Sequence, residues 1–442
     1  MEERWSTEHV LSLAPDAASK KAAGKLSAPA PWSGAGTDGD AVWGECKGSG
    51  STPYRTVVEL ATPAYQCSCP SRKFPCKHAL GLLLLWSGSP RSVPDGAEPA
   101  DWAAEWLKGR QERAEQRAAR VEAPADPAAA RRRAEKRSAR VAAGAAELRL
   151  RLADRVRHGL ADQSTAGPWE EVAARMVDAQ APGLATRVRE LDAVPQQGLL
   201  AEYAMLHLLA TAATRLDELP APLAATVRAR VGYTTETAEL LAGPTVRDRW
   251  QVLGTRTSPM EGGSDERLTT RRLWLRGAKT GRQALLIAFG RPGQAPELAL
   301  PTGQVVEAEL AFHPGARPLR AVLGTRHGAP AAAAPDGPPP GLSVAEAVAG
   351  YGTAVADDPW LDAWPTVLTE VVPVLSEEGW HLTDGRHTVP VHRAAVPEAA
   401  LWRLAAVSTG RPLTVFGEYG HRGFAPVTAW GLDGRPIGLT TT

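Results

Sequence analysis

Residues 67–78 read C-S-C-P-S-R-K-F-P-C-K-H, and this stretch decides how the amino-terminal part of the chain folds. Within twelve residues it places three thiols and one imidazole: Cys67, Cys69, Cys76 and His78. Thiolate sulfur and imidazole nitrogen are ligands that zinc prefers, and four protein ligands fill a tetrahedron without leaving a position for water. The pattern therefore predicts one structural Zn²⁺ ion rather than a catalytic one.

The local geometry expected for this stretch agrees with a metal site. In an extended segment, side chains two residues apart point to the same face, so Cys67 and Cys69 can converge on one ion. Two prolines restrict the loop between the ligand pairs, which lowers the entropy lost when the loop closes. We expect Cys76 at the start of an apolar helix that runs to Trp86. Free N–H groups and the helix dipole favour a thiolate there.

Two other interpretations of the cysteines were weighed against zinc. Buried, unreactive thiols usually have apolar neighbours, whereas these lie among Ser, Pro, Arg and Lys. A redox pair of Cys67 and Cys69 would leave the spacing of Cys76 and His78 unexplained. Cys46 lies 21 residues before Cys67, and we expect it to be a small core residue because the ligand set is already complete.

The stretch and its flanks resemble the SWIM-type zinc finger, whose pattern is C-x-C-x(n)-C-x-H. The resemblance covers about residues 43–86, roughly a tenth of the chain. It implies a small β-β-α module that holds zinc through the four residues named above. Proteins of this family are predicted to bind DNA or other proteins, usually through the finger as an accessory module. Residues 87–442 resemble no family of known function.

Composition bounds the class of protein. The chain has 442 residues, of which 43% are hydrophobic and 22% charged, as is ordinary for a soluble protein of several domains. Fifty basic and 49 acidic residues give a net charge of +1, so the whole chain is not a polycation. Four cysteines exclude a disulfide framework. The longest apolar run, residues 79–86, is far shorter than the ~20 residues that span a bilayer. The first residues also lack the pattern of a signal peptide, so we expect a cytoplasmic protein without a membrane partner.

The distribution of strand, helix and turn signals predicts a multidomain α+β protein with a ββα zinc finger, a helical middle region and a β-rich C-terminal half. We expect short strands at residues 41–47, 54–60 and 65–67, and we interpret residues 27–40 as loop. The expected parts are an N-terminal extension (1–40), the finger (41–86), a linker (87–100), a helical region (101–245, basic at 101–160), a β-rich domain (246–328), a Pro/Ala-rich linker (329–342) and an α+β C-terminal domain (343–442). Within the last part we expect a helix over residues 364–375 and a hairpin at 381–389.

Three other groups of residues were considered as functional motifs. The run 277–281, G-A-K-T-G, lacks the spacing of a phosphate-binding loop and is predicted to be a hairpin turn. His381, His387 and His392 do not have the spacing of a metal site and are expected to be structural or surface residues. The basic segment 131–140 is interspersed with glutamates, which favours a solvated helix face, but it is the best candidate for a nucleic-acid surface.

These observations favour a non-enzymatic, zinc-binding interaction protein. The residues expected to contact its partner are Arg72, Lys73 and Lys77, with Phe74 as an apolar anchor. A protein partner is favoured because the whole-chain charge is near zero and residues 161–442 carry a net charge of −5. DNA or RNA binding through the finger and the 131–140 helix is the second hypothesis. An enzyme with an unrecognised active site in residues 246–442 is the third.

Overall fold

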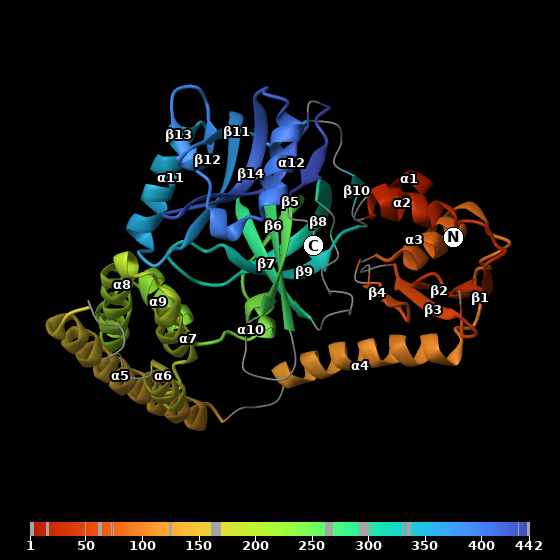
Figure 1. Cartoon of the computed structure of the whole chain (residues 1–442). Coiled ribbons are helices and arrows are strands. Elements are labelled where there is room, and N and C mark those ends of the chain that lie inside the picture. Colours follow the sequence, from red (N-terminus) through yellow and green to blue (C-terminus); the bar gives the residue numbers. More distant parts are fainter. Residues whose placement is uncertain are drawn as a thin grey trace.

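The structure is a computed structural model of the whole chain. It describes residues 4–439 apart from residues 15–16, 49, 61–63, 72, 74, 123–125, 161–168, 261–267, 291–299, 301, 329–330, 333–336 and 432. Figure 1 shows a small N-terminal sheet with helices, a helical middle and two larger sheets in the C-terminal half. The predicted multidomain α+β class is confirmed. No helix among the described residues combines the length and the apolar character needed to cross a membrane.

The N-terminal unit consists of an antiparallel sheet, a helix that packs on it, and two further helices that pack on that helix. Its elements are α1 (Thr7–Ser12), α2 (Ala17–Gly24), β1 (Trp32–Thr37), β2 (Ala41–Cys46), β3 (Tyr54–Glu59), β4 (Ala64–Cys67) and α3 (Lys77–Gly88). Helix α3 is buried from His78 to Trp86 because it is apolar on every side, as expected of a central core helix. A side chain at Gly81 would lie 2.6 Å from Leu26, so this glycine lets the segment after α2 pack directly on α3.

The interpretation of residues 27–40 as loop was wrong for residues 32–37, which form β1 beside β2. The sequence of β1 has little β propensity, so the strand depends on packing rather than on intrinsic preference. A Cβ at Gly36 would lie 2.7 Å from Ala97 and 3.1 Å from the Trp43 ring. Gly36, one of the two glycines that suggested a loop, therefore permits close packing.

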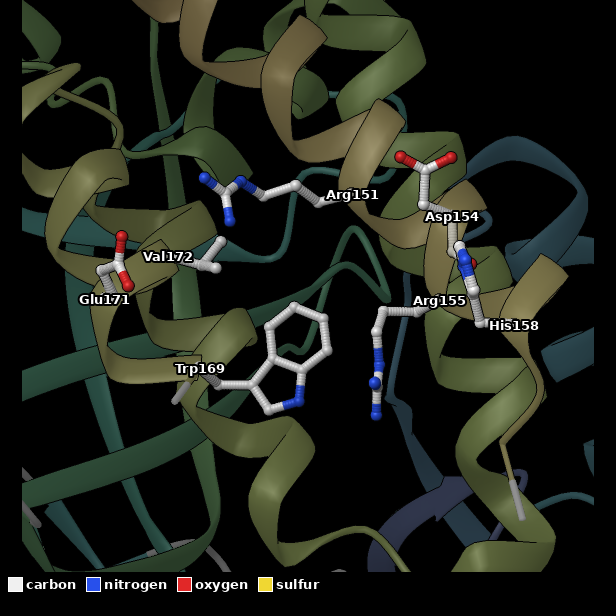
Figure 2. Close-up of a pocket in the computed structure, with 7 residues that line it drawn as sticks. All are labelled: Arg151, Asp154, Arg155, His158, Trp169, Glu171 and Val172. Atoms are coloured by element: carbon white, nitrogen blue, oxygen red, sulfur yellow. The ribbon is translucent and has the colours of Figure 1, made fainter. Parts of the chain in front are cut away.

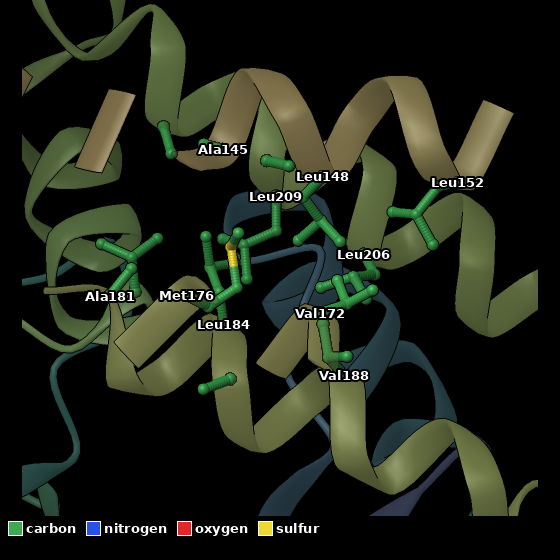
Figure 3. Close-up of a cluster of buried hydrophobic side chains, with 14 of the residues drawn as sticks. Ala145, Leu148, Leu152, Val172, Met176, Ala181, Leu184, Val188, Leu206 and Leu209 are labelled. Carbon is green, nitrogen blue, oxygen red and sulfur yellow. The ribbon is translucent and has the colours of Figure 1, made fainter. Parts of the chain in front are cut away.

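Seven helices follow the N-terminal unit: α4 (Asp101–Glu122), α5 (Pro127–His158), α6 (Trp169–Asp178), α7 (Pro182–Glu190), α8 (Gln196–Thr214), α9 (Ala221–Val231) and α10 (Thr237–Ala242). Helices α5 to α9 form a helical bundle with one apolar core (Figure 3). From α5, the buried residues Val141, Ala145, Leu148 and Leu152 follow the helical period. Residues 131–136 of α5 are exposed, so this helix contributes only its second half to the core.

The first barrel comprises β5 (Thr245–Met260), β6 (Leu268–Gly277), β7 (Gln283–Gly290), β8 (Gln304–Phe312) and β9 (Arg320–Arg326). Strand β5 is long and bends at a register shift between Val252 and Gly254, so it pairs with β8 along its first half and with β6 along its second. Strand β9 closes the ring because it pairs parallel with β7 and antiparallel with β8. A short strand, β10 (Ala331–Ala332), pairs with the start of β8.

The second large sheet begins after α11 (Val344–Asp357) and contains β11 (Ala363–Ser376), β12 (Gly379–Thr383), β13 (Thr388–Pro390), α12 (Glu398–Ser408), β14 (Leu413–Gly420) and β15 (Gly423–Trp430), followed by β16 (Pro436–Gly438). We call it the second barrel because a single parallel bridge between Val391, directly after β13, and Phe424 of β15 closes it. The hairpin of β12 and β13 was predicted, with its turn at Asp384 and Gly385. The helix expected over residues 364–375 was wrong, because this segment is β11. Prolines at 365 and 373 oppose a helix, and the Val- and Thr-rich residues between them fit a buried strand.

The two barrels pack tightly against each other. Leu253 and Trp274 of the first barrel share a buried cluster with Val367, Phe416, Val427 and Trp430 of the second. A Cβ at Gly254 would lie 2.7 Å from Val427, so the bend in β5 needs a glycine at this contact. At the edge of the cluster, Arg256 and Arg272 both pair with the buried carboxylate of Glu418, at 3.0 and 3.5 Å.

The helical bundle is anchored to the segment between α11 and β11. The indole Nε1 of Trp360 donates to the carbonyl of Met205 at 3.0 Å, and its ring belongs to the bundle core. Arg230 pairs with the buried Asp358 at 2.6 Å, and Arg187 pairs with Asp362 at 2.7 Å. One apolar residue flanked by two ion pairs therefore connects the bundle to the second barrel.

Candidate metal centre

The four predicted ligands come from three adjacent parts of the N-terminal unit. Cys67 is the last residue of β4, Cys69 lies in the loop that follows, and Cys76 caps the start of α3, where His78 sits in the first turn. Their three sulfurs and one imidazole nitrogen all lie within 4.8 Å of one another. Metal–sulfur bonds of about 2.3 Å place the corners of a tetrahedron about 3.8 Å apart. The cluster therefore has the size and the donor types that Zn²⁺ requires.

Neighbouring groups fix the orientation of the ligands. The hydroxyl of Thr56, fully buried on β3, donates to Cys67 Sγ at 3.2 Å. His78 Nδ1 lies 3.7 Å from the same sulfur, and the Tyr54 ring packs on the imidazole with centroids 4.7 Å apart. The amide of Ala79 donates to Cys76 Sγ at 3.4 Å, which is the N-cap position expected from the sequence.

The three thiols lie so close together that the charge state of each affects the pKa of the others. Hydrogen bonds from Cys67 and Cys76 lower the pKa of Cys69, whereas contacts with Cys67 and Cys69, together with burial, raise the pKa of Cys76. The contact with Cys69 also raises the pKa of Cys67. A divalent cation removes this mutual effect because it stabilises every ligand as a thiolate. The charge balance of the cluster therefore favours a bound cation.

Cys46, the one cysteine that is not a predicted ligand, is the last residue of β2 and is fully buried. It does not belong to the cluster of four possible ligands. Burial raises the pKa of its thiol, in keeping with the core position expected from the sequence.

The residues expected to contact a partner can be followed only in part. Arg72 and Phe74 lie outside the described residues. Lys73 and Lys77 are exposed, on the loop between the ligand pairs and at the start of α3. Lys73 lies in the loop that joins the two pairs of ligands, and Lys77 lies between Cys76 and His78. Zinc would therefore fix the positions of both lysines.

A second feature, which the sequence pattern did not predict, lies beside the cluster. A groove of about 400 Å³ lies between α2 and the start of α3, lined by Lys21, Lys25 and Lys77 over the apolar side chains of Ala18, Ala22 and Leu26. Within the described part of the chain, no acidic side chain lies within ion-pair distance of these three lysines. We call this feature the lysine groove. The spacing of Ala18, Lys21, Ala22 and Lys25 on one helical face is its sequence signal.

A second cavity, of about 230 Å³, lies in the helical bundle between α5 and α6 (Figure 2). Arg151, Arg155 and His158 line it from α5, opposite the indole of Trp169 on α6. Its charges are largely paired, since Arg151 bonds Glu147 and the nearby Glu171 bonds Arg175. Trp169 packs on Tyr203 with ring centroids 5.5 Å apart, which makes this wall part of the bundle core.

The structure also places two other motifs of the sequence. Residues 278–280 form the turn between β6 and β7, so the predicted hairpin is confirmed. Among the described residues, the only cluster of potential metal ligands is the one in the N-terminal unit, and the three C-terminal histidines are not part of it.

Comparison with known proteins supports the metal centre and assigns the helical bundle. Residues 54–86 match the SWIM zinc finger, and residues 136–231 match the SWIM-associated four-helix bundle domain. The first range runs from β3 to the end of the buried part of α3, and the second from within α5 to the end of α9. No curated protein and no solved structure shows significant similarity to the chain.

Two parts of the chain are thereby assigned. Residues 54–86 are similar to the SWIM zinc finger, and the structure brings its four potential ligands together; residues 136–231 are similar to the bundle domain associated with such fingers. The resemblance drawn from the sequence is confirmed, and it extends to the helical bundle, which the sequence analysis did not recognise.

Proposed function

We propose that this protein is a zinc-dependent, non-enzymatic interaction protein that binds an acidic surface of another protein through the lysine groove. One structural zinc ion, held by Cys67, Cys69, Cys76 and His78, would fold the N-terminal unit. The observation that carries the proposal is the position of Lys77, which lines the groove and lies between two ligands of the cluster.

The supporting argument runs from the metal to the groove. Zinc bound at Cys76 and His78 fixes the first turn of α3, because binding free energy becomes folding free energy in such modules. That turn forms one side of the groove, and α2 forms the other. Three lysines around an apolar floor suit a partner that presents carboxylates beside an apolar side chain.

A complete set of four ligands favours a binding role over a catalytic one, because it leaves zinc no open position for substrate.

Nucleic-acid binding through α5 is the second candidate function. Arg133, Lys136 and Arg140 are exposed there, whereas Arg131 and Arg132 pair with Glu135 and Asp126. Arg137 donates to the Gly232 carbonyl and lies over the Tyr233 ring. Three uncommitted cations make a weaker surface than the sequence indicated.

Affinity purification from native cells, with and without nuclease, separates the two candidates. Lys21→Glu with Lys25→Glu should abolish capture of the partner, whereas Lys20→Glu with Lys47→Glu, of equal charge and also exposed, should retain it. Capture that survives nuclease and fails in the groove variant supports the proposal. Capture that is lost with nuclease, or that is equal in both variants, contradicts it.

A further inference from the structure

The two C-terminal barrels have the same connectivity. In each, the first strand is long and bent, and it pairs with the second and the fourth strands. The third strand pairs with the second, and the fifth strand pairs antiparallel with the fourth. In each, the fifth strand also meets the third in parallel, through Leu286 and Ala321 in the first barrel and through Val391 and Phe424 in the second. The chain therefore contains a structural repeat that its sequence does not reveal.

When the five strands of a barrel are numbered along the chain, their order around the ring is 1-2-3-5-4, and strand 4 pairs with strand 1. This is the strand order of the OB-fold, a five-stranded Greek-key barrel. In the second barrel, α12 lies between the third and fourth strands, where OB-folds carry a helix. Such barrels bind oligonucleotides or oligosaccharides on the outer face around strands 2 and 3. That likeness directs attention to the outer face of β5, β6 and β7, but the fold alone does not assign a ligand.

The outer face of the first barrel is divided into two regions. Its middle, at Leu253, Trp274 and Leu285, is covered by the second barrel. Toward the β6–β7 turn, residues of the same face lie beyond this contact: Arg249 is exposed, and Gln251 and Arg276 are half-exposed. Gln251 is directly opposite Arg276 in the sheet, and Arg276 is opposite Gln283.

The uncovered region carries three cations, although Glu307 of β8 lies directly opposite Arg249. Arg249 and Arg276 lie on adjacent strands, and the exposed Lys279 follows Ala278, whose amide donates to the Arg249 carbonyl at 2.9 Å. We call Arg249, Arg276 and Lys279 the barrel cation patch. None of the three forms an ion pair with a described residue; the nearby Glu307 is held by Arg247 at 2.6 Å. Residues 245–326 carry 13 basic and 7 acidic residues, a net charge of +6, against −1 for residues 363–430.

A buried carboxylate holds the patch in a fixed conformation. Asp248 is 6% exposed and accepts hydrogen bonds from the amides of Arg249, Lys279 and Thr280 and from the Thr280 hydroxyl. The turn that carries Lys279 is thereby tied to the strand that carries Arg249. A preorganised set of cations loses little entropy when it binds.

We propose that the barrel cation patch binds the phosphate backbone of a single-stranded nucleic acid. Its cations would contact successive phosphates, and the amides of Gln251 and Gln283 are placed beside them to hydrogen-bond base edges. A single strand fits because its backbone can follow a curved barrel face. The site is separate from the metal centre and from the lysine groove, so it extends the proposed function.

The test is binding of a fluorescein-labelled oligothymidylate of about 16 nucleotides, the upper range for one such barrel, measured by anisotropy over a series of salt concentrations. Arg249→Gln, Arg276→Gln and Lys279→Gln together should weaken binding. They should also reduce the slope of log K against log salt by about 2, since each single-strand phosphate contact contributes about 0.7. The matched control, Arg386→Gln, Arg393→Gln and Arg411→Gln, removes three exposed cations of the second barrel and should leave the slope unchanged.

Additional variants distinguish this site from the others. The lysine-groove variant should bind the oligonucleotide as wild type does, so failure of the proposed function would not affect this result. A single Arg249→Gln change, which leaves the turn intact, should still reduce the slope by about 0.7. The proposal is overturned if the wild-type protein does not bind the strand, if the patch variant binds with an unchanged slope, or if neutralising Arg133, Lys136 and Arg140 alone abolishes binding.

Discussion

The metal centre depends on single side chains that hold other side chains in place. Thr56 is fully buried, and its hydroxyl donates to Cys67 Sγ, a contact that both orients this ligand and stabilises its negative charge. Groups of this kind control metal affinity almost as strongly as the ligands themselves.

Replacing Thr56 by Val removes the hydroxyl at nearly constant volume. We expect zinc affinity, measured by competition with a chromogenic chelator, to fall by roughly 10- to 100-fold. Thr226→Val, a change at a threonine that is 6% exposed in the helical bundle, is the control and should leave zinc affinity unchanged. Equal affinities for wild type and Thr56→Val would show that this contact does not support the ligand.

The contact between the two barrels also depends on a single residue, Gly254. Gly254→Ala would place a methyl group 2.7 Å from Val427, so we expect unfolding to become easier by about 1–3 kcal/mol. Gly350→Ala, in the open middle of α11, is the control and should stabilise by about 0.5–1 kcal/mol. Thermal or urea unfolding checks both values, and a neutral Gly254→Ala would mean that the barrels are not packed as described.

Secondary-structure elements differ in how far the sequence predicts them. The finger was predictable because its four ligands lie within twelve residues, and the helix after His78 is continuously apolar. β1 was missed because Gly36 packs against Trp43 and Ala97, contacts that no local pattern shows. The first barrel was expected only as a β-rich domain, because its closure into a ring depends on the pairing of β7 with β9, which are distant in sequence.

The lysine groove was missed for a similar reason. Lys77 was expected as a contact residue, but Lys21 and Lys25 lie more than fifty residues earlier in the chain. Only the packing of α2 on α3 brings them together. A surface formed by two segments cannot be read from either segment alone.

The β6–β7 turn makes the stability of the first barrel depend on pH. Burial alone would raise the pKa of Asp248, but hydrogen bonds from Thr280, Lys279 and Arg249 outweigh it, so the pKa lies below its ordinary value. A depressed pKa stabilises the fold above the unfolded value of about 3.9, and this contribution is lost as the pH falls through the folded pKa.

Hydrogen exchange of the Lys279 and Thr280 amides should therefore be slow at neutral pH, and the turn should open in acid. Asp248→Asn should destabilise the turn by about 1–3 kcal/mol at neutral pH and should remove its acid sensitivity. If Asp248→Asn retains the acid transition of the wild type, another group is responsible.

At the scale of the whole molecule, several contacts connect the bundle to the barrels, among them the Arg422–Glu202 ion pair at 3.2 Å and the hydrogen bond from the Ala316 amide to the Thr226 hydroxyl at 2.9 Å. Trp360, 8% exposed, inserts into the bundle core from the segment before β11. The ion pairs of Arg230 with Asp358 and of Arg187 with Asp362 lie beside it. The arrangement of the parts therefore depends strongly on this one indole.

Trp360→Ala should weaken the docking of the bundle by about 3–5 kcal/mol, the usual effect of truncating a buried aromatic residue. Limited proteolysis should then cut faster near residues 357–362, while zinc content stays constant. Trp402→Ala, at a tryptophan that is 54% exposed, should leave the cleavage rate near that of wild type. Unchanged proteolysis of Trp360→Ala would show that the bundle is held by other contacts.

The central claim is that zinc, bound by three sulfurs and one nitrogen, gives the N-terminal unit its structure. Elemental analysis combined with X-ray absorption spectroscopy of the freshly purified, reduced protein tests it most directly. We predict a stoichiometric zinc ion with three sulfur ligands at about 2.3 Å and one nitrogen at about 2.0 Å, lost in Cys69→Ser and retained in Cys46→Ala. Protein without metal, or zinc that persists in Cys69→Ser with unchanged coordination, would contradict the claim.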